Sequence, residues 1–470
     1  MMVITFATGS QSDDGGGPLR SAAEAVTVLD FGAKGDGVTP DNAAIARAIV
    51  ASCSRPNRGQ IHFPAGDYAV AANAPITIPC PGIALVGNGG GAQQRGGTRF
   101  VIVGSGREPI FRFAAPVRPG DRYFYGGAIR DIAFLFRDNS MASQPQSGPA
   151  VRFDHCWGCL VENVFVAGAQ NAFWVYAGFH IHFHDVFVTQ AVSNGYAFTF
   201  SGDTSGKNCN ADIGNCTTRL DVVDLTDFHV DEALSGHVVP GGCIHVTGFV
   251  ATVWVRNGTC NQTHIAVKTD CPRELSHDIG TCPQFIDLYR LESEINAAGD
   301  PGDSACILAL DIVHFHASAY QCYGYGPPDN LMVFRDANDS GSAHVELDNP
   351  YIANARHDCI IDSVLDFKLS GGDVIGCGTE GTTHAGARHA GLHISARPSS
   401  HVSKGATIVN GTNFCTGYKE KAETSMVGVR IDEGIDYASI QNNIFRGCIK
   451  GVIMPPTRNT TNIVTGNTPE

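Results

Sequence analysis

From residue 125 onward, apolar and polar residues alternate in short segments that meet at a single Asn or Asp. The segments CLVENVFV around Asn163 and IHFHDVFV around Asp185 show this pattern. Apolar residues spaced by two lie on one side of a strand, and the residues between them lie on the other side. Two strands that meet at one residue require a sharp bend, and Asn and Asp tolerate the left-handed backbone conformation that a bend needs. The pattern therefore predicts short strands joined at bends.

The same pattern recurs along the chain at irregular intervals, because polar insertions of variable length separate the copies. Stacked copies would bury a continuous apolar interior that no single copy can bury alone, so we expect each copy to be one coil of a solenoid. Clear copies are centred on Asp131, Asn163, Asp185, Asp227, Asn257, Asn349, Asn410 and Asn442, and weaker copies fall at Arg290, His314 and Gly371.

A third apolar segment follows each bend after a short interval, as in YAFTF, HIAVKT, CIID and GVRID. Three strands per coil predict an all-β fold, a single-stranded right-handed parallel β-helix with three sheets and about eleven or more coils. Alternating strands also build sandwiches and propellers. The sequence lacks the regular hairpin spacing of a sandwich and the blade signature of a propeller, so the β-helix is favoured.

The segment GDGVTPDNAAIARAIVASC, which precedes the repeats, predicts a short helix. Thr39 is a good N-cap, Pro40 suits the first helical position and Asp41 favours the positive end of a helix. A narrow apolar stripe along this helix would consist of Ile45, Ala48 and Ile49.

This segment resembles the entry motif GDGVTDDTAAIQAAI of pectate-lyase-superfamily proteins, a group that includes phage tailspikes and many polysaccharide-degrading β-helices. The likeness continues through GQIHFPAGDYAV (59–70) and ITIPCPGIALVGNGG (76–90). In that family the segment closes the N-terminal end of the solenoid, so the resemblance implies that the helix is a cap. The specific likeness covers residues 27–105, and beyond them it is architectural.

The chain is accordingly divided into four parts. We expect residues 1–26 to be a flexible N-terminal arm that attaches the protein to a virion, and residues 27–105 to hold the cap and first coils. Residues 106–456 would form the β-helix with loop insertions, and residues 457–470 a C-terminal tail. The start lacks the features of a secretory signal, and no apolar run is long enough to span a membrane, which favours a virion or extracellular location.

Charge and cysteine content narrow the class of partner. A net charge of −14 opposes nucleic acid and anionic membranes, so neither is expected as a partner, and membrane insertion is not expected. No cofactor is expected.

Sixteen cysteines, with pairs such as Cys209/Cys216 and Cys271/Cys282 inside polar insertions, indicate either local disulfides in an oxidising setting or small apolar core residues.

The outward positions on the strand before each bend carry carboxylates, imidazoles and aromatic rings. Rings cover sugar faces, and carboxylates accept hydroxyl hydrogen bonds or act as acid and base, so these positions predict a saccharide groove. The alternative is a solvated face, or a face that contacts sister chains in a homotrimer. The candidates for the substrate groove are His184, Asp224, Trp254, Arg256, Asp287, Tyr289 and Asp311.

Two further motifs, a run of alternate histidines and a Cys-x-x-Cys segment, could in principle bind a metal ion or act in redox chemistry. Alternation would place His180, His182 and His184 on one face, but alternate residues of a strand project in parallel and converge poorly on one ion, so no metal is expected. The HCWGC segment has Cys-x-x-Cys spacing at Cys156 and Cys159. It predicts a structural pair or core thiols rather than a redox site.

Third-strand segments resemble the motifs of polygalacturonase-type glycosidases. NARHDCIIDS, RHAGLHIS and GVRID are similar, in the same order, to NQDDCIAINS, GGHGLSIG and GVRIK. The resemblance implies catalytic candidates at His357, Asp358, His389 and Arg430. His357 replaces the first carboxylate, His389 is displaced by one residue, and Asp432 stands in place of the substrate-binding Lys, so only Asp358 and Arg430 match position for position.

Three hypotheses for function follow. In the first, the chain is a virion-associated, tailspike-like protein, homotrimeric, that binds a host surface polysaccharide and cleaves it as a glycosidase rather than a lyase. In the second, it is a non-catalytic virion protein of the capsid, collar or tail, a rigid rod stabilised by disulfides. In the third, it is a secreted polygalacturonase-like glycoside hydrolase.

Overall fold

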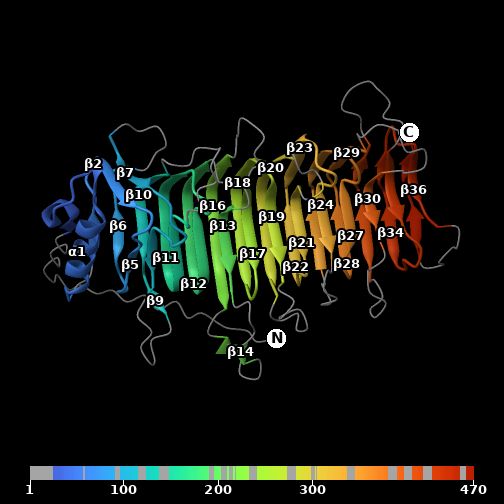
Figure 1. Cartoon of the computed structure of the whole chain (residues 1–470). Coiled ribbons are helices and arrows are strands. Elements are labelled where there is room, and N and C mark those ends of the chain that lie inside the picture. Colours follow the sequence, from blue (N-terminus) through green and yellow to red (C-terminus); the bar gives the residue numbers. More distant parts are fainter. Residues whose placement is uncertain are drawn as a thin grey trace, which may run out of the picture.

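The computed structural model is a long stack of parallel strands with one α-helix at its N-terminal end (Figure 1). The described residues are 25–56, 59–89, 96–114, 123–136, 148–189, 195–202, 209–210, 215–216, 219–231, 241–271, 282–297, 302, 304–335, 344–378, 389–395, 405–415, 426–455 and 462–469. The predicted arm, residues 1–26, lies almost wholly outside them.

The strands form three parallel ladders, which we name sheets A, B and C. Sheet A precedes the predicted bend of each coil. It contains β1 (Val26–Thr27), β3 (Gln60–His62), β6 (Ala84–Val86), parts of β10 (Ala128–Phe136), β11 (Val151–Ala167), β12 (Phe173–Thr189), β16 (Leu220–Asp231), β18 (Thr252–Thr263) and β20 (Phe285–Asn296), and then β22 (His314–Ser318), β25 (His344–Asp348), β28 (Asp366–Ser370), β31 (Thr407–Asn410), β34 (Ala438–Gln441) and β37 (Ile463–Thr465).

Sheet B follows the bend, and the later parts of β10, β11, β12, β16, β18 and β20 belong to it. Its other strands are β2 (Asp36–Pro40), β4 (Gly66–Ala71), β7 (Thr98–Val103), β23 (Gln321–Gly326), β26 (Tyr351–Ala355), β29 (Asp373–Cys377), β32 (Asn413–Phe414), β35 (Ile444–Phe445) and β38 (Thr468–Pro469). The segment predicted as a tail, 457–470, thus contributes β37 and β38 to two sheets.

Sheet C is the predicted third strand of each coil, and it includes the first parts of β11 and β12. Its other strands are β5 (Ile76–Ile78), β8 (Phe111–Phe113), β13 (Tyr196–Ser201), β17 (Gly242–Thr247), β19 (Ile265–Asp270), β21 (Ala305–Leu310), β24 (Met332–Arg335), β27 (Ile360–Ser363), β30 (Ala390–Ile394), β33 (Val427–Ile431) and β36 (Lys450–Ile453). β9 (Phe124–Tyr125) pairs with β11 at the corner between sheets C and A, and β14 (Cys209–Asn210) pairs antiparallel with β15 (Asn215–Cys216).

Parallel strands joined by crossovers within one sheet are almost always connected in the right-handed sense. The fold is therefore the predicted right-handed parallel β-helix. Phenylalanine side chains fill much of its interior and stack from coil to coil, as between Phe113 and Phe153 and between Phe173 and Phe198. This shared interior is what no coil could bury alone.

The bend between sheets A and B is a single residue in the left-handed region, as predicted for most coils. Asn163 at one bend donates a hydrogen bond of 2.6 Å to Asp131 at the bend before it. The predicted bend residues with φ between 50° and 66° are Asp131, Asn163, Asp185, Asp227, Asn257, Arg290, Asn349, Gly371 and Asn442.

Two predicted bends are wrong in position. At Asn410 the left-handed residue is the following Gly411, with φ 70°. His314 begins β22, and the bend of that coil is Ala319, with φ 51°. The sequence does not mark the bend at Ala319, because that coil has neither Asn, Asp nor Gly at the turning position, whereas the bend at Gly411 is displaced by one residue from the predicted Asn.

The cap helix α1 (Asn42–Cys53) lies against η1 (Val28–Phe31) and the first strands, and its predicted apolar stripe is buried. The predicted capping residues are wrong. Thr39 and Pro40 belong to β2, and the N-cap is Asp41. The Asp41 carboxylate is buried and accepts from the backbone N–H of Lys34 and of Gly35 instead of capping the helix, which fixes the turn before it.

Disulfides join the cap and the coils. Cys53 at the end of α1 is bonded to Cys80 next to the first coils. The predicted Cys271–Cys282 pair is present, and the backbones of Cys209 and Cys216 pair in the β14–β15 hairpin, although their side chains lie outside the described part. The remaining bonds of the described residues are Cys156–Cys159, Cys243–Cys260, Cys306–Cys322, Cys359–Cys377 and Cys415–Cys448.

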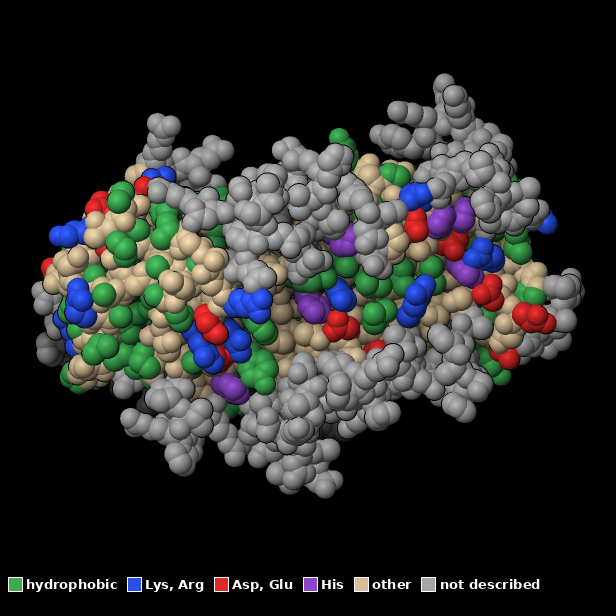
Figure 2. Space-filling view, viewed as in Figure 1, with side chains coloured by type: hydrophobic (Ala, Val, Ile, Leu, Met, Phe, Trp, Pro, Cys, Tyr) green, Lys and Arg blue, Asp and Glu red, His purple; other side chains and the backbone are tan. Residues whose placement is uncertain are grey.

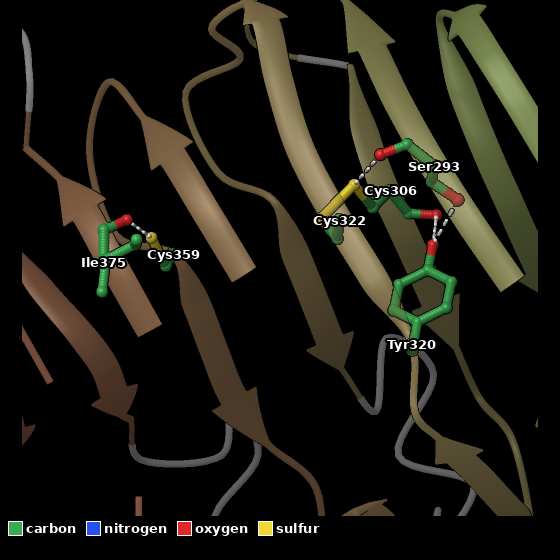
Figure 3. Close-up of a disulfide and its surroundings, with 6 residues drawn as sticks. All are labelled: Ser293, Cys306, Tyr320, Cys322, Cys359 and Ile375. Carbon is green, nitrogen blue, oxygen red and sulfur yellow. Dashed lines mark hydrogen bonds between the residues drawn. A yellow bond between two sulfur atoms is a disulfide. The ribbon is translucent and has the colours of Figure 1, made fainter. Parts of the chain in front are cut away.

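Some of these bonds cross the interior of one coil from sheet C to sheet B. Figure 3 shows Cys306 of β21 bonded to Cys322 of β23. Ser293 lies in register between Cys260 and Cys322 on sheet B, and it accepts a 2.7 Å hydrogen bond from the hydroxyl of the buried Tyr320. The interior is therefore cross-linked covalently in some coils and by a polar contact in a coil between them.

We expect the Ile45→Ala substitution to lower the free energy of unfolding by about 2–5 kcal/mol, because Ile45 is fully buried between the cap helix and the first coils. Val50 lies on the opposite, exposed side of the same helix, so Val50→Ala should change it by about 0.5 kcal/mol or less. Chemical denaturation followed by circular dichroism measures both. Equal effects of the two substitutions would contradict the capping role.

Candidate functional site

The outer face of sheet C carries a charged cluster over its C-terminal strands and another over its N-terminal strands. In Figure 2 histidine, acidic and basic side chains gather over the C-terminal strands of this face, and a second group of basic and acidic side chains lies over its N-terminal strands. Between them the outward column passes through His245 and Lys268, which both lie next to Asp270, and then through the apolar Leu308, Val333 and Ile361. The C-terminal cluster contains two of the predicted catalytic candidates in direct contact.

Asp358 is the centre of the C-terminal cluster. It precedes β27 and is buried, and its Oδ1 accepts a 2.6 Å hydrogen bond from the backbone N–H of Ala390. Its Oδ2 lies 3.2 Å from Nδ1 of His393 and 3.2 Å from a terminal nitrogen of Arg430. His393 and Arg430 are register neighbours on β30 and β33, so the stacking of coils itself brings them to Asp358.

The surroundings of Asp358 keep it ionised. Burial acts to raise the pKa of this carboxyl, but the hydrogen bond with His393, the positive charge of Arg430 and the N–H of Ala390 outweigh it and hold the pKa below its usual range. A buried carboxylate with both oxygens occupied is suited to orienting its neighbours.

His393 lies between two carboxylates. Its Nε2 is 3.0 Å from Oδ1 of Asp432, and its Nδ1 is 2.6 Å from a nitrogen of Arg430. A neutral ring with its proton on Nε2 donates to Asp432 and accepts from Arg430, whereas a second proton on Nδ1 would point to Asp358. The Nε2 side of the ring therefore faces a carboxylate that solvent reaches, because Asp432 is 40% exposed.

The other two catalytic candidates form a pair beside this cluster. The rings of His357 and His389 stack with centroids 4.7 Å apart and an angle of 17°. Nδ1 of His357 lies 3.7 Å from the carboxylate of Asp329. His357 and His389 thus contact each other beside Asp329, and Asp358 and Arg430 contact each other in the network around His393.

The groove candidates lie on a different face, the outer side of sheet A. Six of them occupy two adjacent columns there. Asp224, Trp254 and Asp287 are register neighbours in one column, and Arg256 and Tyr289 are neighbours in the other, with His184 two coils before Arg256. The structure thus groups the groove candidates, but on another sheet from Asp358 and Arg430.

Asp311 is wrong as a groove candidate. It is buried, with φ 54°, at the corner between β21 and β22, and does not point out from sheet A. The outward position in that coil is His316. Its Nδ1 lies 2.9 Å from Asp287 and its Nε2 lies 3.4 Å from Asp348.

The sheet A face is crossed by further paired charges. Lys368 contacts Glu346, and this contact lowers the pKa of Glu346 and raises that of Lys368. His344 lies 3.0 Å from Asp366, and His184 lies 3.3 Å from Asp227. These polar side chains are mostly satisfied by one another, which is the pattern of a solvated sheet face.

The three alternate histidines and the Cys-x-x-Cys segment both lie in described parts of the chain. His180 occupies a left-handed bend with φ 55°, so the strand alternation that grouped it with His182 and His184 is interrupted there, and its ring centre lies 6.3 Å from that of His182. Among the described residues no group of three or more His, Cys, Asp or Glu is arranged to hold a metal ion. Cys156 and Cys159 are buried and bonded to each other. In the part of the chain that is described, no helix is long and apolar enough to cross a membrane.

Sequence reasoning missed His393 as a site residue. The sequence signal for His393 is its place in the segment RHAGLHIS, two residues beyond Gly391. Arg430 is the register partner of His393 on the next strand. Comparison with the glycosidase motif indicated His389 instead of His393. Counting outward positions along sheet C would have found His393.

Two comparisons of sequence match a limited part of the chain. Residues 25–107 match the family model described as rhamnogalacturonase A/epimerase, pectate lyase-like. A segment of 71 residues, 15% of this chain, is 39% identical to the tail spike protein of Shigella phage Sf6 and covers 11% of that relative's length. The chain therefore aligns with only a small fraction of that curated relative.

Comparison of structures extends the likeness over the whole length. Tailspike protein 3 of bacteriophage CBA120 superposes with a TM-score of 0.59 at 15% identity, covering 95% of this chain and 61% of that one. An N-terminal fragment of gene product 12 of bacteriophage phi29 gives a TM-score of 0.56 at 13% identity, covering 90% and 66%. The chain therefore has a parallel β-helix fold like that of these phage proteins, and its residues 25–107 match the pectate lyase-like family model.

Proposed function

We propose that this protein is a phage virion component of the tailspike kind that binds a host surface polysaccharide along sheet C and hydrolyses it at the cluster around His393. The observation that carries the proposal is the buried Asp358 carboxylate, which holds His393 and Arg430 beside the exposed Asp432. Ionisable groups of this kind, gathered on an otherwise regular face, are typical of functional sites.

Each group in the cluster has a role in this proposal. Asp432 is the carboxylate that water reaches, and it takes a proton from the attacking water. His393 protonates the glycosidic oxygen as the bond to the anomeric carbon breaks. Asp358 is a positioning residue, and Arg430 stabilises negative charge next to the ring.

A further part of the proposal concerns how copies of the protein associate with one another and with the virion. We propose that the N-terminal arm attaches to other virion proteins and that three copies associate through their β-helices. The sheet A columns around Trp254 and Asp287 then belong to the contact between copies. The likeness to tailspike proteins supports the virion setting.

A non-catalytic rod is the second candidate function, and one observation favours it. The Asp358 carboxylate is fully occupied by internal partners, and the interior is cross-linked by disulfides, as suits a rigid support. A secreted polygalacturonase-like hydrolase is a weaker candidate, because His357 stands where the glycosidase motif has its first carboxylate and Asp432 stands where it has the substrate-binding Lys.

The test is to incubate the purified protein with capsule or lipopolysaccharide from candidate hosts and to measure new reducing ends. Removing an acid or base group costs about 10²–10⁴-fold in rate, so we expect Asp432→Asn and His393→Gln to abolish detectable release. Asp287→Asn on sheet A is the matched control and should leave release unchanged. Binding without release by any of these proteins would favour the non-catalytic rod.

The lowered pKa of Asp358 predicts that the free energy of unfolding depends on pH. Because its folded-state pKa is below its unfolded value, its stabilising contribution is present above the unfolded pKa and is lost as pH falls through the folded pKa. At neutral pH we expect Asp358→Asn to lower the free energy of unfolding by about 3–5 kcal/mol, because Arg430 loses its buried partner.

Denaturation at several pH values measures this effect. The difference between the wild-type protein and Asp358→Asn should shrink below about pH 4, where the unfolded-state carboxyl of the wild type becomes protonated. Asp287→Asn, at an exposed ion pair, should change stability by about 1 kcal/mol or less at every pH. A difference that stays constant down to pH 2 would contradict the ionised, buried state of Asp358.

A further inference from the structure

Two arginines lie next to each other in the N-terminal cluster of sheet C. Arg112 on β8 and Arg152 on β11 are register partners, so their side chains project from the same face of adjacent strands. Like charges directly opposite each other destabilise a sheet. The pair therefore works against folding in this position, in a chain whose net charge is −14.

One carboxylate compensates only half of this charge. Asp154 is buried, and its two oxygens accept from the Nε atoms of Arg112 at 2.5 Å and Arg152 at 2.6 Å. Two guanidinium groups and one carboxylate leave one net positive charge. Within the described residues, the contacts of both arginines with oxygen acceptors involve only Nε, so their terminal nitrogens keep donors that face outward.

The arginine pair is held rigidly. The guanidinium of Arg152 lies 4.4 Å from the ring centre of Trp174 and 5.6 Å from that of Tyr176. The indole N–H of Trp174 donates to Ser201 at 2.8 Å, which fixes the ring. A guanidinium already fixed by a carboxylate and a ring loses little freedom when it binds a second acceptor, so the pair is organised before any ligand arrives.

Exposed aromatic rings lie beside the pair, where β11 turns from sheet C to sheet A. Tyr125 is 50% exposed and Trp157 is 41% exposed, and their rings are 5.7 Å apart. Tyr123 contacts Trp157 edge to face. Asp154 and Trp157 are three residues apart on β11, at most about 10 Å on an extended strand, which is a span that a sugar unit held by an anionic substituent can bridge. Such rings provide flat apolar surfaces with polar edges, which suit the faces of sugar rings.

We propose that Arg112 and Arg152 bind the anionic group of a sugar unit, a carboxylate or a phosphate, whose ring contacts Tyr125 and Trp157. Forked guanidinium donors match either group in two-point contacts. That the sugar belongs to a polysaccharide rests on the proposed function above. From Arg152 to His393 there are eight strand steps along sheet C, on the order of 38 Å, so this is a recognition site distant from the cleavage site.

The test compares glucose, glucuronate and glucose 6-phosphate, which differ only at carbon 6, as ligands of the full-length protein in ligand-observed NMR titrations. Charge-assisted hydrogen bonds predict that at least one anionic sugar binds about 10-fold or more tightly than glucose, and the tighter of the two identifies the group. Equal binding of all three sugars would overturn the proposal. So would equal binding of inorganic phosphate and glucose 6-phosphate, because the rings would then contribute nothing.

Variants separate recognition from a structural role. Arg112→Gln should remove the preference for the anionic sugar, and Trp157→Ala should weaken both anionic and neutral sugars. Lys268→Gln, a cation farther along the same face, is the matched control and should change neither. Because Arg112→Gln removes a like-charge neighbour, the thermal midpoint should stay the same or rise. A lower midpoint with unchanged sugar binding would assign the pair to structure alone.

Failure of this proposal and failure of the proposed function give different results. Asp432→Asn should keep the preference for the anionic sugar while losing release from the polysaccharide. Arg112→Gln should keep release at saturating polysaccharide and need more polysaccharide to reach it, since the arginines are remote from the reacting bond. Loss of release in Asp432→Asn with no anionic preference in the wild-type protein would reject the recognition site only.

Discussion

Every feature of this protein depends on the register between stacked coils. A coil has too few apolar residues to form a core, so it is stable only when its interior side chains meet those of the coils before and after it. The register is set where each coil turns from sheet A to sheet B at one left-handed residue, and the Asn163 to Asp131 hydrogen bond links two such corners directly. A slip by one residue would turn interior side chains outward.

This register also decides what the surface can do. Outward side chains from successive coils lie in straight columns, so a chemical group is positioned by its place in the column and by the strand spacing of about 4.7–4.9 Å. His393 and Arg430 meet because they are register partners, and the same holds for Arg112 and Arg152. A rigid, ladder-like face suits a repeating polymer better than a small molecule, and the interior disulfides keep that face from flexing.

Much of the fold was predictable because the alternation of apolar residues reports directly on the interior. The bends at Asn and Asp, the third strand of each coil and the buried stripe of α1 all follow from periodicity. The bend at Ala319 did not, because its left-handed conformation is imposed by its neighbours in the stack and not by its own side chain. The helix start at Asp41 was misplaced for a related reason, since its carboxylate serves the preceding turn.

The site was less predictable than the fold. Asp358 and Arg430 were found by resemblance, but the resemblance could not show that His393 lies between them or that Asp311 is buried at a corner. Alternation tells which residues point outward within one coil. It does not tell which sheet faces a ligand, so it could not choose between the groove candidates on the strand before the bend and the catalytic candidates on the third strand.

Hydroxyl-radical footprinting of the full-length protein, with and without a bound host polysaccharide, tests most directly whether sheet C is the binding face. The chain has three tryptophans, with Trp157 and Trp174 beside the sheet C arginines and Trp254 on sheet A. The account predicts that Trp157, Trp174 and His393 are protected from oxidation while Trp254 reacts as in the free protein. Protection of Trp254 with no change at Trp157 and His393 would contradict it.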